Sequence, residues 1–440
     1  MFQLAQPLGG ADLKTYQRAL SKLQGNILTS HGRDFAQHVF LTFKGQPDQA
    51  RDFLSKFADR VTSATAQQDQ TARKNQTSEL FASVSLSAEG YKYLGFDVTS
   101  FSKEFQAGMK NAALADPPST GWEDKFQRPI HAMVILAHDS REELNRQMES
   151  RSELVRGFAD VSSELGIAIH HNHNRRDYVI EHFGYRDGLS QPIFYKKAVP
   201  AEHEQWDPSA GPNLVLVKDP LVESNDACGT YFVFRKLEQN VKEFQMRAEA
   251  LAVSLKLPEK DAESAGAMII GRFTDGTPVV KYKEPKARAE NDFQYQKFDP
   301  AGNRCPFFAH IRKANPRNGD ADRARRIARR GITYGEPIAS SDPSTLPATG
   351  VGLLFQCCQA DLHEQFEFLQ HSWADNNDFP TKGTGKDPVI GESADGFPPL
   401  EFPCTWDKPE RTQFDLPSLV TMKGGEYFFV PSISFLKGLK

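Results

Sequence analysis

The stretch FGYRDG at residues 183–188 places one carboxylate, that of Asp187, in a short segment framed by Gly184 and Gly188. Glycine permits positive φ angles and aspartate bonds nearby amides, so this composition is typical of a structural turn. A carboxylate held in such a turn is also a candidate acid–base group, because one positioned side chain can take and return a proton. Taken alone, the stretch favours the structural interpretation.

The histidine of CPFFAHIRKANPR, His310, is a second candidate. It follows an apolar run and precedes three cations, Arg312, Lys313 and Arg317. A buried imidazole beside cations suits haem, whose iron takes a nitrogen ligand and whose propionates require positive charges. Without further context, a core histidine capped by surface charges is the simpler interpretation.

Two adjacent arginines, Arg329 and Arg330, stand immediately before a glycine and an expected strand in ARRGITYGEP, residues 328–337. Arginines at the start of a strand are usually solvated. If one of the pair points inward, it becomes a fixed cation that stabilises developing negative charge during a reaction.

Three histidines, His170, His171 and His173, crowd together in IHHNHNRRD, residues 169–177. Two of them, His171 and His173, would share one face of a strand, as metal ligands can. No carboxylate or cysteine completes the group at a familiar spacing, so a polar loop or strand end is favoured. A non-haem metal oxidase built on this cluster is the alternative.

The elements that must position these groups follow one pattern twice. The residue pattern of the first half predicts strands at 38–43, 82–87, 132–138 and 177–183. It also predicts helices at 47–61, before Gly95 and after Ser140. The second half predicts strands at 229–237, 332–338, 351–358 and 426–433, with helices at 238–252 and 361–374. This β-α-β-β-α-β order is the ferredoxin-like pattern, so we expect an α+β fold of two ferredoxin-like units with antiparallel sheets. A segment rich in proline and polar residues lies between them, and we expect domains at residues 1–205 and 206–440.

Composition excludes several other classes of protein. The net charge of −4 gives no reason to expect nucleic acid or an anionic membrane as a partner. The longest aliphatic stretches, such as AMVILA at 132–137, are far too short to span a bilayer. Five cysteines match no zinc pattern and no disulfide scaffold, and the N-terminus lacks the features of an export signal. The expected location is therefore the cytoplasm.

Together, FGYRDGLSQP, CPFFAHIRKANPR and RRGITYG occur in an order that resembles the dye-decolourising peroxidases, a family of haem peroxidases. The stretch LQGNILTSHGRDFAQHVFLTFK at 23–44 and GGEYFFVPS at 424–432 resemble the longer, insertion-bearing branch of that family. The resemblance covers nearly the whole chain. It implies two ferredoxin-like halves, in agreement with the repeat, and a haem held mainly by the second half.

The resemblance implies a role for each candidate near the peroxide. Asp187 would be the acid–base group that moves a proton between the two peroxide oxygens. Arg329 would stabilise the separating charge, with Arg330 as the competing assignment.

The resemblance also implies how the haem is held. His310 would be the metal ligand, with Asp387 of GKDPVIG as the carboxylate partner of its ring; Glu392 and Glu364 remain alternatives for that partner. Arg312 and Arg317 would pair with the haem propionates.

The activity implied is the reduction of H₂O₂ to water by haem b, one per chain. Bulky organic donors, such as anthraquinone-type dyes and phenolics, would be oxidised in one-electron steps through an oxyferryl porphyrin radical. A haem-handling protein with weak peroxidase turnover is the alternative, although simple carriage has no need of the pair Asp187 and Arg329. The sequence leaves the oligomeric state open.

Overall fold

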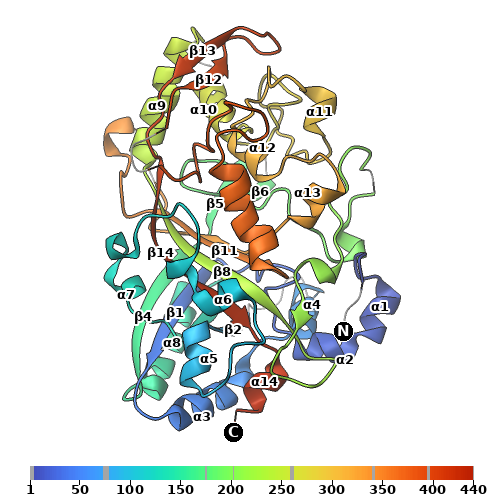
Figure 1. The fold of residues 1–440 in the computed structure, drawn as a ribbon, viewed down its shortest axis with the longest axis vertical. Coiled ribbons are helices and arrows are strands. Elements are labelled where there is room, and N and C mark those ends of the chain that lie inside the picture. The colour runs from blue at the N-terminus through green and yellow to red at the C-terminus, as the bar shows by residue number, and fades with distance from the viewer. Residues whose placement is uncertain are drawn as a thin grey trace.

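The chain is built around one antiparallel sheet to which both halves contribute. The structure, a computed structural model, describes residues 4–72, 79–173, 176–201, 203–257, 262–338, 342–393 and 397–439. The strands of the sheet are β1 (Phe35–Phe43), β2 (Phe81–Leu86), β3 (Ala132–His138), β4 (Ala159–Ile167), β7 (Val217–Lys218), β8 (Cys228–Gln239), β9 (Ala328–Arg329), β10 (Ile332–Tyr334), β11 (Gly352–Gln359) and β14 (Val420–Val430). Because β8 pairs with both β14 and β11, the sheet closes into a barrel (Figure 1). The strands β7 and β9 stay outside this ring of pairings.

Each half of the barrel has the strand order of a ferredoxin-like unit. The order is β4-β1-β3-β2 in the first half and β14-β8-β11-β10 in the second, and counted within each half both are 4-1-3-2. Two seams join the halves, at Phe429 and Leu86 between β14 and β2, and at Tyr334 and Gly166 between β10 and β4. The expected pair of ferredoxin-like units with antiparallel strands is thus confirmed. The division of the chain at residues 205 and 206 stays a prediction.

The predicted fourth strand of the first half, residues 177–183, is wrong. The strand in that position is β4, whose sequence ADVSSELGI is too polar to attract attention as a barrel strand. Its buried Glu164 bonds to Lys236 Nζ of β8 at 2.6 Å, so an ion pair occupies a place where an apolar side chain is expected. Residues 177–180 belong instead to β6 (Arg176–Ile180), which pairs with β5 (Ile169–His173) in a separate hairpin.

Helices cover the outside of the barrel and build the rest of the molecule. The α-helices are α1 (Gly10–Thr15), α2 (Gln17–Lys22), α3 (Pro47–Phe57), α4 (Ala64–Ala72), α5 (Ala88–Tyr93), α6 (Lys103–Ala107), α7 (Asp124–Gln127), α8 (Arg141–Val155), α9 (Val241–Ser254), α10 (Ala262–Ile270), α11 (Tyr295–Phe298), α12 (His310–Ala314), α13 (Asp320–Ala324) and α14 (Ile433–Lys437). The π-helical segments η8 (Leu362–Glu367) and η9 (Leu369–Ala374) occupy the predicted helix at 361–374. The predicted cap of α8 is present, since Ser140 Oγ accepts the amide N–H of Glu143 at 3.2 Å.

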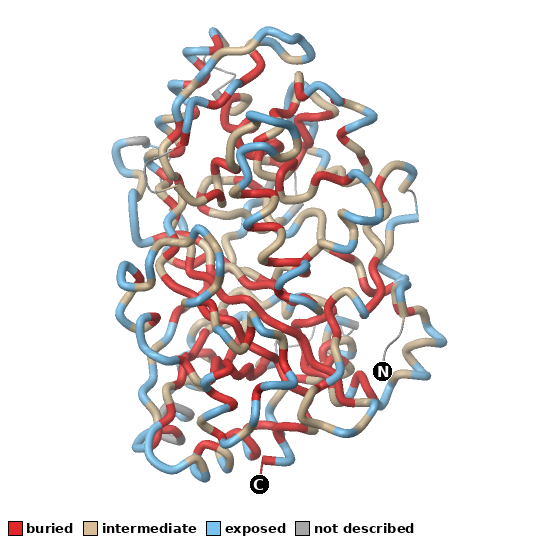
Figure 2. The backbone as a smooth tube through the Cα atoms, viewed as in Figure 1, coloured by how far each residue is buried: buried red, intermediate tan, exposed pale blue. Residues whose placement is uncertain are grey.

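A lobe above the barrel in Figure 1 contains α9 to α13 and the hairpin of β12 (Leu400–Pro403) and β13 (Arg411–Phe414). Apart from α9, which belongs to the second ferredoxin-like unit, it is formed by the long insertions of the second half. One cluster of buried apolar side chains fills the barrel region, and two separate clusters lie in the lobe. Figure 2 shows the same arrangement, with the longest buried runs of backbone along the barrel strands.

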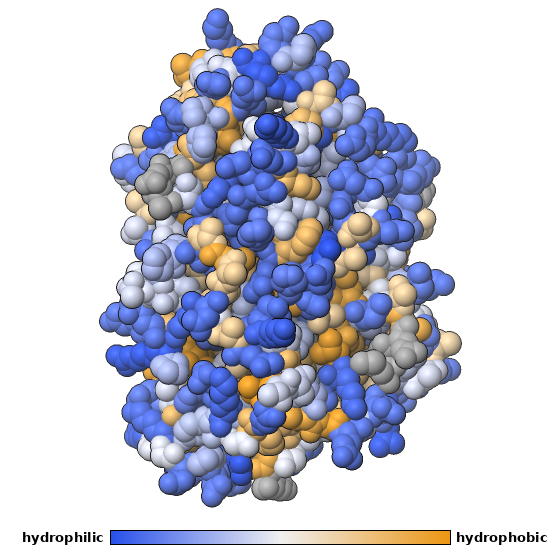
Figure 3. All heavy atoms as spheres, in the orientation of Figure 1, coloured by the Kyte–Doolittle hydropathy of each residue, from blue (hydrophilic) through white to orange (hydrophobic). Residues whose placement is uncertain are grey.

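The surface gives no sign of a bilayer-spanning element. Within the described ranges, the helices are all too short or too polar to cross a membrane. The face drawn in Figure 3 is largely hydrophilic, and its apolar side chains form small separate patches.

Candidate functional site

A cavity of about 250 Å³ lies between the barrel and the lobe. Barrel strands β8 and β11 line one part of it, and lobe helices α10 and α12 line another. Much of its wall is aliphatic or aromatic, and these residues include Phe183, Leu189, Ile270, Phe273, Ile311 and Phe355. Asp187, His310 and Arg329 all line this one cavity, so the fold brings together three groups that lie far apart in the sequence.

The imidazole of His310 is held from outside the cavity. His310 is the first residue of α12, and its Nδ1 lies 2.9 Å from Oδ2 of Asp387. Because a carboxylate accepts hydrogen bonds, Nδ1 carries the proton and Nε2 is the nitrogen available to a metal. The predicted contact between His310 and Asp387 is therefore present.

Asp387 is itself fixed. Its side chain is fully buried, and its other oxygen accepts the amide N–H of Val389 at 2.8 Å and of Ile390 at 3.1 Å. The two alternative partners, Glu364 and Glu392, make other contacts. Glu364 pairs with Arg325, and Glu392 donates its amide N–H to Asp375 while its side chain lines the cavity.

Asp187 lies in a turn whose glycines have the conformations that the sequence suggests. Gly184 and Gly188 have φ angles of 93° and 76°, a region that favours glycine. The amide N–H of Asp187 donates to Val179 O at 3.0 Å, which ties the turn to β6, and Oδ1 accepts the Gly188 N–H at 2.6 Å. The side chain of Asp187 is 27% exposed and keeps contact with the cavity.

The two adjacent arginines point in opposite directions, as neighbours on a strand do. Nη1 of Arg329 lies 3.7 Å from Asp187 Oδ1, and Nη2 donates to Leu189 O at 2.6 Å. Arg330 is buried and donates instead to the carbonyls of Asn26 at 2.9 Å and Ile27 at 2.6 Å. Of the pair, Arg329 lines the cavity, as expected, and Arg330 braces the N-terminal segment.

A cluster of cations without acidic partners borders the cavity. Ser190 Oγ accepts hydrogen bonds from Arg272 at 3.3 Å and from Arg317 at 2.7 Å. Within the described part of the chain neither arginine makes an ion pair, and the buried Nε of Arg317 has no hydrogen-bond partner. Burial, reinforced by the charge of Arg317, lowers the pKa of Arg272 to about 9, and burial lowers the pKa of Arg317 to about 10. A bound dianion would offset the cost of burying these two positive charges, so the cluster fits the propionates of a haem.

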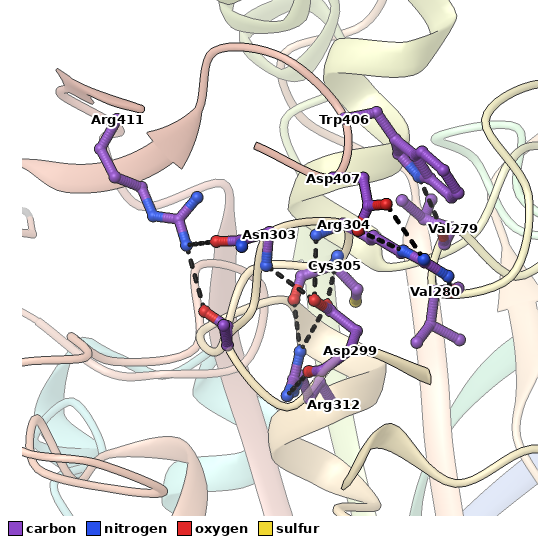
Figure 4. Close-up of polar contacts among 11 residues, drawn as sticks. Val279, Val280, Asp299, Asn303, Arg304, Cys305, Arg312, Trp406, Asp407 and Arg411 are labelled. Carbon is purple, nitrogen blue, oxygen red and sulfur yellow. Dashed lines mark hydrogen bonds and ion pairs between the residues drawn. The ribbon is translucent and has the colours of Figure 1, made fainter. Parts of the chain in front are cut away.

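Arg312, which was expected to pair with a propionate, has protein partners. Its Nη1 lies 2.9 Å from Asp299 Oδ2, and it also donates to the carbonyls of Cys305 and Asp299 (Figure 4). Arg312 does not line the cavity. It stands two positions after His310 on α12, and helical residues two apart face different sides.

Sequence reasoning missed several polar residues of the cavity. Burial raises the pKa of Glu181 and of Glu392 to about 7. Gln239, at the end of β8, and Arg272 also line the cavity. The acid Glu181 stands six positions before Asp187, so the turn motif itself could have drawn attention to it. Arg272 has no comparable signal, and Glu392 was expected only as an alternative partner of His310.

The histidine cluster has other partners. His170 lies 2.8 Å from Asp34 and 3.1 Å from Asp177 through its two ring nitrogens. His171 is exposed and packs against Tyr178, whereas the side chain of His173 lies outside the described residues. In the described ranges, the group of three potential metal ligands that does converge is elsewhere, at Glu104, His363 and Glu367.

Comparison with known proteins agrees with the geometry. The family model of the DyP dimeric alpha+beta barrel domain matches residues 22–165, and the Dyp-type peroxidase C-terminal model matches residues 209–382. The chain is 40% identical to the multifunctional dye peroxidase DyP2 of Amycolatopsis sp., over 96% of both chains. It is 29% identical to the dye-decolorizing peroxidase msp1 of Mycetinis scorodonius, over 95% of this chain and 87% of that one.

Solved structures are similar as well. The DyP-type peroxidase of Anabaena sp. superposes with a TM-score of 0.91 at 38% identity, over 99% of this chain and 97% of that one. The structure of DyP2 from Amycolatopsis sp. gives 0.92 at 36% identity, over 99% of each chain. This chain therefore belongs to the dye-decolourising peroxidases, a family of haem-dependent enzymes.

Proposed function

We propose that this enzyme binds one haem b per chain and reduces hydrogen peroxide to water with electrons from bulky aromatic compounds. The observation that carries the proposal is the cavity that joins His310 and its carboxylate partner to the pair Asp187 and Arg329. The names of the relatives describe dye peroxidases, which supports dyes as donors. Anthraquinone-type dyes and phenolics are the donor classes that we propose.

Five side chains would hold the haem and tune it. His310 Nε2 would bind the iron, and Asp387 would accept the Nδ1–H and keep the imidazole basic. Arg317, with Arg272 beside it, would neutralise the propionates. Ile311, next to His310 on α12, adds apolar wall to the cavity. Bound haem supplies the two electrons that open the O–O bond.

Asp187 and Arg329 would act on the peroxide. Asp187 takes the proton from one peroxide oxygen and returns it to the other, which then leaves as water. Arg329 stabilises the negative charge that develops as the O–O bond opens. In the whole reaction, two electrons and two protons convert one H₂O₂ into two waters, and each donor molecule supplies one electron.

A reducing compartment such as the cytoplasm is the proposed location. All five cysteines are free, and four of them, Cys228, Cys305, Cys357 and Cys358, are buried. Burial raises the pKa of Cys305 to about 12, so its thiolate is scarce and its reactivity low. Free thiols of this kind are typical of proteins from reducing compartments.

An absorption spectrum before and after one equivalent of H₂O₂ tests the proposal. The expected result is a ferric Soret band that changes within seconds and returns when a dye or phenol is added. Slow bleaching without a donor-dependent return would point to haem handling. A protein without a Soret band, even after haem is added, would contradict the proposal.

A further inference from the structure

The carboxylate of Glu181 contacts the turn FGYRDG along the part that precedes Asp187. Its Oε2 accepts the amide N–H of Phe183 at 2.9 Å, and its Oε1 accepts the amide N–H of Tyr185 at 2.9 Å. The main chain repeats the link, because Glu181 N–H donates to Tyr185 O at 3.0 Å and Gly184 N–H donates to Glu181 O at 2.9 Å. One residue therefore closes this part of the turn through both its backbone and its side chain.

The same carboxylate ties the turn to the barrel of the second half. Nε2 of Gln239, the last residue of β8, donates to Oε2 of Glu181. Gln239 is held in turn by its own amide N–H, which donates to Val351 O at 2.9 Å. Both side chains line the cavity that contains Asp187 and Arg329.

This link matters because Asp187 and Arg329 come from different halves of the chain. Asp187 stands in the turn after β6, whereas Arg329 stands in β9, which pairs with barrel strand β11. Their 3.7 Å separation exceeds a hydrogen bond. The hydrogen bonds that Arg329 donates, from its side chain to Leu189 O at 2.6 Å and from its amide N–H to Gln191 Oε1 at 3.0 Å, hold only the segment after Asp187. The position of the turn against β8 must therefore be set by other contacts.

A carboxylate is suited to this place. It offers two oxygens to two amide N–H groups and one side-chain amide, and these hydrogen bonds oppose the burial that raises its pKa to about 7. A glutamine would turn its own NH₂ toward one of the donors, because its side chain has a single acceptor oxygen.

We propose that Glu181 is a positioning residue that holds the turn FGYRDG against β8 and so sets the distance between Asp187 and Arg329. The inference rests on the proposed function, since it assumes that Asp187 acts on peroxide. That Glu181 stabilises the turn through hydrogen bonds is a separate claim, and it can be tested without measuring catalysis.

The substitution Glu181→Gln, with Glu426→Gln as its matched control, separates the two claims. Glu426 of β14 is also a buried carboxylate that accepts two amide N–H groups, from Met109 at 3.1 Å and from Tyr427 at 2.8 Å. It does not line the cavity. Both variants and Asp187→Asn are prepared as holoenzymes and compared with the parent by haem content, by the stopped-flow rate of reaction with H₂O₂, and by amide hydrogen exchange.

We expect Glu181→Gln to keep its haem, to react with H₂O₂ at least about tenfold more slowly, and to exchange the amides of residues 183–188 faster. Glu426→Gln should speed exchange near Met109 and leave the peroxide rate unchanged. Unchanged exchange at 183–188 in Glu181→Gln would overturn the inference, as would equal slowing by both variants. If Glu181→Gln binds no haem, Glu181→Asp, whose shorter carboxylate withdraws from the amides, takes the same measurements.

The Asp187→Asn variant distinguishes the two levels of failure. A full peroxide rate in Asp187→Asn would contradict the role of Asp187 in the proposed function, while faster exchange in Glu181→Gln would still show that Glu181 holds the turn. A slow Asp187→Asn beside a fast, haem-loaded Glu181→Gln would overturn the positioning role alone.

Discussion

The two sides of the cavity hold their polar groups in opposite ways. On the histidine side, His310 and Asp387 are 2.9 Å apart, and Asp387 is fully buried with two further amide N–H groups on its second oxygen. On the acid side, Asp187 and Arg329 are 3.7 Å apart, and their side chains are 27% and 35% exposed. We call the first pair the locked side, because hydrogen bonds fix both of its members. We call the second pair the loose side, because its members are too far apart for a hydrogen bond.

The difference agrees with the roles that we propose for the two sides. A metal ligand needs one geometry, and the hydrogen bond to its second nitrogen fixes the ring and raises its basicity. An acid–base group must reach two oxygens in turn, and a tight ion pair would withhold its lone pairs from both. The fixed geometry of the histidine pair and the wider separation of the acid pair therefore suit two different tasks within one site.

The largest effect, a loss of haem binding, is expected from removing the imidazole of the locked side. His310→Ala should lose most of its haem, with the affinity falling by more than the ten- to hundredfold typical of losing a ligand's partner alone. The Soret absorbance per protein, measured after gel filtration with added haem, reports the loss. His371→Ala, which changes an exposed histidine, is the control and should load normally. A normally ligated His310→Ala variant would remove His310 as the metal ligand.

On the acid side, Arg329→Leu should retain haem and react with H₂O₂ about a hundred- to a thousandfold more slowly, because one preorganised charge is lost. The rate under single-turnover conditions is the measurement. Arg330→Leu is the matched comparison: it removes the guanidinium hydrogen bonds to the carbonyls of Asn26 and Ile27, so it should lower the thermal midpoint and spare the rate. If the two variants exchange these phenotypes, the arginine assignment is off by one residue.

Loosening the locked side should have a smaller effect than removing it. Asp387→Asn keeps the shape but removes the charge beside His310 Nδ1, and we expect about a ten- to hundredfold loss of haem affinity. The midpoint potential of the iron should become more positive, since a less basic imidazole stabilises the oxidised metal less. Glu364→Gln, at the alternative partner that pairs with Arg325, should change neither quantity.

The smallest effect concerns the pH dependence of stability. Burial raises the pKa of Glu392 from 4.5 to about 7. The folded protein therefore holds a proton that the unfolded chain releases between about pH 4.5 and 7, and this contribution to stability is lost as pH rises through that window, at up to about 1.4 kcal/mol per pH unit. Glu392→Gln should raise the thermal midpoint relative to the parent at pH 7 more than at pH 5. A difference that is the same at both pH values would contradict the raised pKa.

The residues of both pairs were predicted from the sequence, whereas the cations near them were predicted only in part. Taken singly, the stretches around Asp187, His310 and Arg329 favoured structural interpretations, and the family resemblance gave these residues and Asp387 their predicted roles. Arg312 lies two positions along the helix from His310, and its side chain contacts Asp299 and does not line the cavity, so its pairing with a propionate stays a prediction. Arg272 joins the cation cluster only through tertiary packing against Ser190 and Asn291, which no local pattern reveals.

The strands show the same limit of prediction from local sequence patterns. Apolar strands such as β3 and β8 were predicted closely, since their periodicity is strong. The strand β4 was missed because its inward Glu164 is neutralised by Lys125 and Lys236, residues of other elements. Hydrophobic patterns assume an apolar interior, so a buried ion pair hides a strand from them.

The most direct test of the account is the reaction of Asp187→Asn with H₂O₂. Asparagine keeps the size of the side chain and the turn but cannot take up a proton. We predict normal haem content, an unchanged ferric Soret band, and a peroxide reaction slower by about a hundredfold or more in single-turnover measurements. A haem-loaded Asp187→Asn variant that reacts at the parental rate would contradict the account and leave FGYRDG as a structural turn.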